Sequence, residues 1–202
     1  MKALDPRAKV IIRDTNLEEI KDCEAYVNST NTSGGMSATS KAIKAIVGSQ
    51  PFTDLSSKLE EGKYNYGEVV RTGPAGHAAQ IYHSLTPSAD GTDKLEAIRG
   101  ILNKIFDMAN EDGVTKLALT PIGTGGAGIP IDTFIDALAE DVVDYIYMKA
   151  KSLRVVIIAC NDSDKAKLLL DKFKKKIATI YSDSDESSDD GEYQADIDFI
   201  KN

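Results

Sequence analysis

The sequence predicts an α/β fold: a three-layer α/β/α sandwich around a mixed, mostly parallel central sheet. Short runs rich in β-branched residues alternate along the chain with longer segments whose apolar residues recur at helical spacing. The most hydrophobic run, Arg154–Ala159 (RVVIIA), is apolar from its second residue onward, which suits a strand buried on both faces of a parallel sheet. Strands that alternate with helices are typical of this architecture.

The individual elements follow from local patterns. Strands are expected at 9–13, 25–28, 68–72, 80–84, 116–120 and 154–159, and helices at 38–47, 52–61, 93–108, 132–146 and 163–177. Gly48 and Gly62 provide stop signals for the first two helices. Asp93 and Asp132 are expected to cap the N-termini of the third and fourth.

The length and composition indicate one domain rather than two. The chain has 202 residues, of which 42% are hydrophobic. No apolar run approaches the length of a membrane span, and the start MKALDPRAK lacks the apolar stretch of a signal peptide. We therefore expect an intracellular protein, cytoplasmic or nuclear, without membrane contact, either a monomer or a module of a larger protein. Cys23 and Cys160 are isolated, so buried reduced thiols are expected.

The negative charge is concentrated at one end of the chain. Residues 182–202 contain eight acidic residues and one lysine, and so hold most of the net charge of −8. This composition predicts a domain over 1–181 followed by an acidic, disordered tail over 182–202, in which only ADIDFI has the apolar content to dock on the domain or a partner. The nearly neutral body lacks the basic face of a duplex-nucleic-acid binder. The lysines of 163–177 fit either a solvated helix face or a surface onto which the tail folds.

The segment PIGTGGAGIP at 121–130 follows a predicted strand and precedes a predicted helix. Its glycines permit close backbone approach and positive φ, so its amides and the helix N-terminus can converge on an anion. No Lys-Ser/Thr pair follows the glycines, and their spacing differs from GxGxxG, so neither an ATPase loop nor a dinucleotide-binding turn is indicated. Alone, the segment fits a phosphate cradle or a plain connecting turn.

A second strand–glycine–helix junction favours the cradle. Asn28–Ile43 reads NSTNTSGGMSATSKAI, which alone is explained by ordinary helix capping. Ligands of open α/β sheets bind beyond the carboxyl ends of the strands, where two such junctions can meet. Two amide-rich loops that face each other suit a diphosphate better than a single phosphate, and they need no lysine to bind it.

Four motifs in order give the chain a resemblance to macro domains. VNSTN at 27–31 with the glycine pair after it resembles that family's VNAAN…GG segment. GEVVRTGPAG at 67–76 and IYH at 81–83 resemble its next stretch, and LALTPIGTGGAGIP at 117–130 resembles its second phosphate loop. The resemblance covers about residues 8 to 176. It implies a three-layer α/β/α fold that binds ADP-ribose, with no metal and no other cofactor.

The resemblance also implies a set of ligand-binding residues. Asp14 stands where the family's Asp accepts a hydrogen bond from the adenine amino group, although a helix or turn cap explains it equally well. Asn31 stands where the family contacts the distal ribose, and Asn161 where it encloses the adenine. The full set of expected ADP-ribose contacts is Asp14, Thr15, Asn31, Gly34, Gly35, Met36, Ser37, Gly123, Thr124, Gly125, Gly126, Ala127, Gly128, Ile129 and Asn161. His83 is expected to be structural and His77 an exposed turn residue.

The first loop bears on whether the protein is an enzyme. The family's hydrolases carry an acidic residue there, whereas Gly35–Thr39 reads GMSAT, without a carboxylate or imidazole. A hydroxyl is a poor general base unless another group activates it. The first hypothesis is therefore a module that binds ADP-ribose, free or at the end of a modification on mono- or poly-ADP-ribosylated proteins, with no catalytic residue. The alternatives are an ADP-ribosyl hydrolase or another enzyme of ADP-ribose derivatives, and a degenerate macro fold that binds proteins.

Overall fold

The computed structural model describes residues 9–62, 64–78, 80–87, 93–142, 145, 151–182 and 197–201. Its centre is a seven-stranded sheet in the order β3-β4-β2-β5-β6-β1-β7. The strands are β1 (Lys9–Asp14), β2 (Ala25–Thr30), β3 (Val69–Thr72), β4 (Gln80–Leu85), β5 (Lys116–Leu119), β6 (Val155–Ala159) and β7 (Ile197–Lys201). All neighbouring strands run parallel except β3, which is antiparallel to β4. The mixed, mostly parallel sheet predicted from the sequence is confirmed.

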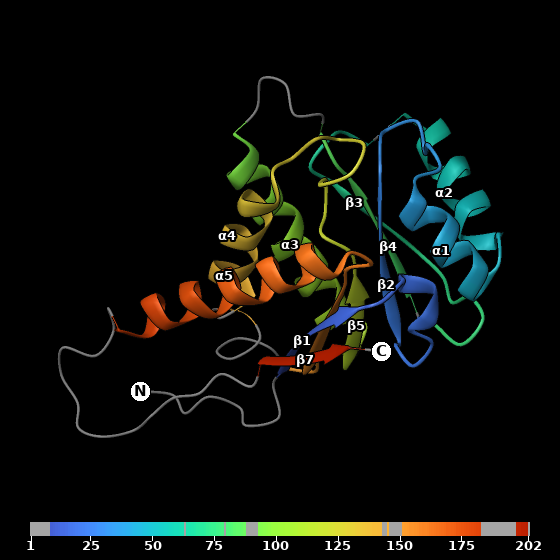
Figure 1. The fold of residues 1–202 in the computed structure, drawn as a ribbon. Coiled ribbons are helices and arrows are strands. Elements are labelled where there is room, and N and C mark those ends of the chain that lie inside the picture. The colour runs from blue at the N-terminus through green and yellow to red at the C-terminus, as the bar shows by residue number, and fades with distance from the viewer. Residues whose placement is uncertain are drawn as a thin grey trace.

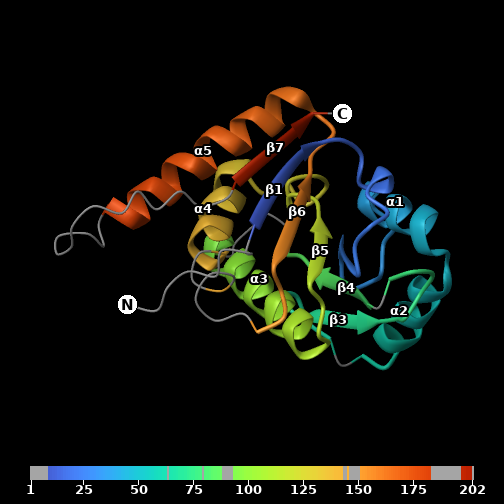
Figure 2. The same cartoon turned by 90° about the horizontal axis from the view of Figure 1, so that it is seen from below.

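Helices cover both faces of this sheet. The helices are α1 (Ala38–Val47), α2 (Gln50–Glu60), α3 (Lys94–Glu111), α4 (Ile131–Val142) and α5 (Ser163–Ser182), and a short 3-10 helix, η1, spans Leu17–Glu19. Figures 1 and 2 show α1 and α2 on one face, and α3, α4 and α5 on the other. None of the described helices is long and apolar enough to cross a membrane.

The core on each face arises from the alternation of side chains along the central strands. In β6, Val156 and Ile158 pack with the layer of α3, α4 and α5, while Ile157 packs with the layer of α1 and η1. In β5, Leu117 packs with the layer of α3, α4 and α5, and Ala118 packs with the layer of α1 and η1. Because both faces of the central strands are buried, the strands end at one edge of a rigid platform, and the loops that follow them are fixed there.

Several element predictions are confirmed with small shifts in their ends. Asp93 caps α3, since its side chain accepts a hydrogen bond from the Glu96 amide. Gly48 ends α1 with φ +86°. The prediction for Asp132 is wrong: α4 begins at Ile131, so Asp132 lies in its first turn, where its carboxylate pairs with Lys172 of α5.

The end of the acidic segment also differs from the expectation of a disordered tail. Ile197–Lys201 forms β7, which pairs in parallel with β1, so the apolar end of the segment is part of the sheet. A strand this short gains enough backbone hydrogen bonds from the exposed edge of β1 to be ordered despite its acidic neighbours. Residues 183–196, the acidic part of the predicted tail, lie outside the described residues.

The basic character of α5 has a structural explanation. Lys172 pairs with Asp132, and Lys176 pairs with Asp136 and Glu140, all on α4. These contacts join α5 to α4. Part of the predicted basic face is therefore occupied within the domain.

Candidate functional site

The first glycine segment connects β2 to α1 and is held in shape by side chains. Asn31 Oδ1 accepts hydrogen bonds from the Ser33 and Gly35 amides, each at 3.0 Å. Thr30 Oγ1 donates to the Gly35 carbonyl at 2.8 Å. A Cβ on Gly35 would lie 3.0 Å from Asn31 Nδ2, so any larger residue there would push the Asn31 side chain away. The segment is thus a braced loop.

A buried polar network supports this loop from below. Ser37 caps α1 in a reciprocal arrangement with Ser40, whose hydroxyl donates to Asn28 Oδ1 at 2.8 Å. The Asn28 amide lies 3.0 Å from His83 Nδ1, and His83 Nε2 lies 2.8 Å from Thr72 Oγ1. Since an amide nitrogen can only donate, His83 Nδ1 accepts and Nε2 carries the proton.

His83 is therefore a structural residue, as expected. Its side chain is fully buried. Burial, together with the nearby charge of Lys58, lowers the pKa of the imidazole to about 3. A neutral imidazole inside a satisfied network holds β4 against β2 and α1. His77 is exposed in a turn, also as expected, and its Nε2 lies 3.0 Å from the Tyr26 hydroxyl.

The second glycine segment connects β5 to α4, and its first and last glycines shape the loop. Gly123 and Gly128 have φ of +76° and +69°. The Ile129 amide donates to the Gly123 carbonyl at 2.9 Å, which closes the loop on itself. A Cβ on Gly123 would lie 2.6 Å from Ile129 Cδ1, and Ile129 is only 2% exposed. These residues therefore form the packed base of the loop.

The middle of the same loop is open. A Cβ on Gly125 or Gly126 would meet nothing within 4 Å. Within the part of the chain that the structure describes, the amides of Gly125, Gly126 and Ala127 donate to no protein acceptor. The first-turn amides of α1, at Ala38 and Thr39, likewise have no acceptor among the described residues. Unused amides on two facing loops are the donors that an anion requires.

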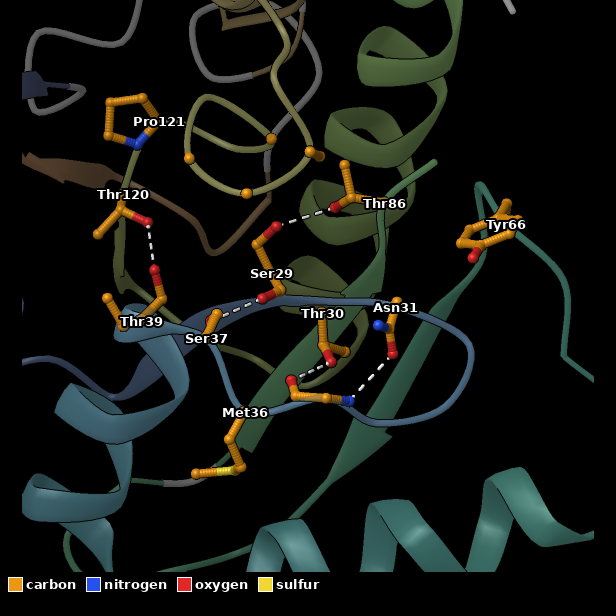
Figure 3. A pocket seen from close by; sticks show the side chains of 16 residues that line it. Ser29, Thr30, Asn31, Met36, Ser37, Thr39, Tyr66, Thr86, Thr120 and Pro121 are labelled. Carbon is orange, nitrogen blue, oxygen red and sulfur yellow. Dashed lines mark hydrogen bonds between the residues drawn. The ribbon is translucent and has the colours of Figure 1, made fainter. Parts of the chain in front are cut away.

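A cavity of about 490 Å³ lies between the two loops (Figure 3). We call it the first cavity; it is lined by Ser29, Thr30, Asn31, Gly35, Met36, Ser37, Ala38, Thr39, Tyr66, Thr86, Thr120, Pro121, Gly123, Gly125, Gly126 and Ala127. Its walls are hydroxyls, amides and small apolar groups. The lining described here includes no carboxylate, imidazole, thiol or ammonium group.

A second cavity of about 450 Å³ adjoins the first on the side of β1 and β6. It is lined by Thr15, Asn16, Leu17, Glu18, Ala38, Thr39, Lys41, Ala42, Thr120, Pro121, Thr124, Gly125, Ile131, Ala159, Cys160, Asn161, Asp162 and Lys165. The two cavities share Thr39 and Thr120, whose hydroxyls lie 3.0 Å apart. This threonine pair lies where the two cavities meet, a position that we call the waist. The two cavities together form one groove across the edge of the sheet.

The second cavity differs from the first in its charges. Lys41 and Lys165 lie on its wall, as do Glu18 and Asp162. Asp162 accepts a hydrogen bond from the Lys165 amide, which holds the pKa of this carboxyl below its usual range, and its side chain pairs with Lys165 Nζ at 3.5 Å. Burial raises the pKa of the Cys160 thiol, so this group stays protonated.

Most of the predicted ligand residues line the groove. Eight lie round the first cavity: Asn31, Gly35, Met36, Ser37, Gly123, Gly125, Gly126 and Ala127. Thr15, Thr124 and Asn161 line the second, which Gly125 also borders. The Asn161 amide donates to Asn16 Oδ1 at 3.1 Å, so two amide side chains meet there.

Four predicted residues line neither cavity. Asp14 accepts a hydrogen bond from the Ser163 hydroxyl and so ties the end of β1 to the start of α5. The Gly34 amide donates to the Asn31 carbonyl, with φ +69°, and so forms part of the turn. Gly128 and Ile129 belong to the base of the second loop. In each case the residue supports a loop or strand end without facing the groove.

Several lining residues were not expected from the sequence. Thr86 and Thr120 directly follow β4 and β5, so their position at the same edge as Thr30 was available from strand-end reasoning. Ser29 lies within β2, and its hydroxyl bonds Thr86 Oγ1 at 2.9 Å. Tyr66 comes from the turn before β3, far from either glycine segment, and no pattern marks it. The two lysines of the second cavity were not expected from the sequence either.

The chain is similar to a known protein family. The family model of the Macro domain matches residues 27–138, more than half of the chain. A search of curated proteins found no significant match. The chain belongs to the macro-domain family.

Solved structures agree with that assignment. The Trypanosoma brucei macrodomain in complex with ADP is similar at 18% identity and a TM-score of 0.68, over 86% of this chain and 74% of that one. The same macrodomain in complex with ADP-ribose gives 18% identity and 0.66, over 86% and 78%. A variant of the Oceanobacillus iheyensis macrodomain with ADPR gives 15% and 0.71, over 86% and 94%. At these identities the likeness establishes the fold.

Proposed function

We propose that the groove binds ADP-ribose, with the diphosphate held between the two glycine loops. The observation that carries this proposal is the set of unused amides at Gly125–Ala127 and at the start of α1, on opposite sides of the groove. Backbone amides and a helix N-terminus bind an anion without a formal positive charge. Macrodomains of the same fold have been solved with ADP and with ADP-ribose, which supports a ligand of this class.

The two cavities suit the two ends of this ligand. The second cavity, with the amides of Asn16 and Asn161, offers donors and acceptors for a base. The first cavity offers Asn31 and the hydroxyls of Ser29 and Thr86 for the distal ribose. Asn31 Nδ2 has no acceptor among the described residues, so it is available to a sugar oxygen. The proposal requires no metal or further cofactor.

The chemistry of the first cavity favours binding without turnover. Hydrolysis at the anomeric carbon needs a group that positions or deprotonates water, and a carboxylate or imidazole does this best. The described lining of the first cavity offers only hydroxyls and an amide, apart from the Tyr66 phenol. We infer a reader of ADP-ribose, free or attached to a protein, rather than a hydrolase.

Calorimetry with the full chain tests the binding proposal. We expect one ADP-ribose per chain, with weaker binding of ADP and weaker binding still of AMP, since each truncation removes contacts from one end. A wild-type protein that binds none of the three would refute the proposal and favour a macro fold that binds only proteins.

A turnover assay separates the reader from the hydrolase. We expect no release of ADP-ribose from a mono-ADP-ribosylated protein above the rate without enzyme. Release well above that rate, abolished by Asn31→Ala, would assign the protein to the hydrolases instead.

A further inference from the structure

Two large apolar side chains that line the first cavity are also exposed to solvent. Among the described residues, Met36, Tyr66 and Leu168 are the large hydrophobic side chains that are exposed, by 46%, 54% and 39%. Met36 and Tyr66 both line the first cavity, whereas Leu168 lies on α5 and lines neither cavity. Tyrosine is enriched at contact surfaces, because it combines a large apolar ring with a polar hydroxyl.

The turn that carries Tyr66 is firmly anchored. The Glu68 amide donates to the Asn65 carbonyl at 3.3 Å, and Gly67 in the third position of this turn has φ +83°. The Gly67 amide donates to the Leu85 carbonyl at 2.8 Å, and Lys104 Nζ donates to the Gly67 carbonyl at 2.7 Å. The turn is thus tied to β4 and α3, and the ring is displayed from a rigid base.

Tyr66 lines the end of the first cavity that lies farthest from the waist. In Figure 3, the lining side chains extend from Thr39 and Thr120, at the waist, to Asn31, and the Tyr66 ring lies farther along the same direction. A ligand with its base in the second cavity and its diphosphate at the waist places its distal ribose near Asn31. A protein segment attached to that ribose would then extend toward Tyr66.

We propose that Tyr66 forms a subsite for the protein segment that carries the ADP-ribose, and that this subsite favours an apolar residue next to the modified one. This inference rests on the proposed function and extends it from the nucleotide to its acceptor. The hydroxyls and amide of the first cavity match a sugar, whereas a half-exposed phenol ring gains most when an apolar side chain covers it. The Tyr66 hydroxyl has no hydrogen-bond partner among the described residues, so no hydrogen bond fixes the orientation of the ring.

Three probes distinguish the acceptor from the sugar: free ADP-ribose, a mono-ADP-ribosylated peptide with leucine on both sides of the modified residue, and the same peptide with glycine there. We expect the leucine peptide to bind about fivefold more tightly than free ADP-ribose, a gain typical of one apolar contact. The glycine peptide should bind like free ADP-ribose. Tyr66→Ala should remove the advantage of the leucine peptide, so that this variant binds the leucine peptide no more tightly than it binds free ADP-ribose.

Two variants serve as controls. Tyr66→Phe keeps the ring, so it should keep the advantage, and Leu168→Ala removes an exposed apolar side chain outside the groove, so it should change nothing. An equal loss for peptide and free ADP-ribose in Tyr66→Ala would show that the ring contacts the sugar and would overturn the inference. An advantage that survives Tyr66→Ala would overturn it as well. A wild-type protein that binds neither peptide nor ADP-ribose would refute the proposed function itself.

Discussion

The two glycine segments reach the same groove but are stabilised in different ways. The first, Asn31–Ser37, is braced by side chains that also line the groove, so its folding and the proposed binding of ADP-ribose depend on the same groups. The second, Gly123–Ile129, divides into a packed base at Gly123, Gly128 and Ile129 and an open middle at Gly125 and Gly126. Changes in the second loop should therefore separate stability from binding, whereas changes in the first should alter both.

The largest expected effect is on binding at the open middle of the second loop. Gly126→Glu should weaken ADP-ribose binding by about 100-fold or more, because its carboxylate enters the groove beside the diphosphate. The free energy of unfolding should hardly change, because a Cβ there meets nothing within 4 Å. Calorimetry and urea unfolding measure the two effects.

Gly100→Glu is the matched control for this change. Gly100 lies in α3, a Cβ there also meets nothing within 4 Å, and it lines neither cavity. Binding should be unchanged in this variant. An equal loss of affinity in both variants would show that added negative charge, rather than the open middle of the loop, is responsible.

The next effect concerns the buried network under the first loop. The pKa of His83 is near 3 in the folded protein and about 6.5 in the unfolded chain, so protonation favours unfolding. Stability should be fully present above about pH 6.5 and fall by up to about 1.4 kcal/mol per pH unit as the pH drops toward 3. Urea unfolding at several pH values should show a shallower slope in His83→Gln than in wild type, and identical slopes would contradict the assignment.

A smaller effect is expected on stability at the base of the second loop. Gly123→Ala should lower the free energy of unfolding by about 2 kcal/mol, because φ is +76° and the new Cβ meets Ile129 Cδ1 at 2.6 Å. Gly125→Ala, two residues further on, should change it by less than about 0.5 kcal/mol. Two variants with equal stability would remove the distinction between base and middle.

The smallest effect, and the one that should not separate folding from binding, lies in the first loop. Asn31→Ala should weaken ADP-ribose binding by about tenfold, since it removes a donor to the sugar. It should also lower the free energy of unfolding by about 1 kcal/mol, because the Ser33 and Gly35 amides lose their acceptor. Calorimetry and unfolding on the same preparation check both, and a change in only one would show that bracing and binding are separate here too.

Much of the fold was predictable because its signals are local. The apolar run Val155–Ala159 predicts its strand, and the helical spacing of Ile98, Leu102, Ile105 and Phe106 predicts α3. The strand at Ile197–Lys201 was not predicted as part of the sheet, because its pairing with β1 depends on a partner more than 180 residues away. The sequence just before it is strongly acidic, and that composition predicts disorder.

The part of the proposed site that backbone amides form was predictable from the sequence. Gly125 and Gly126 follow from the strand–glycine–helix pattern, since amides need no particular side chain. Tyr66 was missed because it enters the groove through tertiary packing, from the turn before β3. Thr86 directly follows β4, so the rule that ligands bind beyond strand ends could have found it. Asp14 and Ile129 line neither cavity and support strand and loop ends, a difference that spacing in the sequence does not show. Their contact with ADP-ribose stays a prediction.

The clamp of two amide-lined loops is tested most directly by following backbone amides during a titration. In a nitrogen-15 NMR titration of the full chain with ADP-ribose, we expect the largest shifts at Gly125, Gly126 and Ala127 of the second loop, and at Ala38 and Thr39 of α1. Amides in α3, on the far side of the sheet from α1, should not move. Saturating ADP-ribose that leaves these five amides unshifted would contradict the proposed clamp.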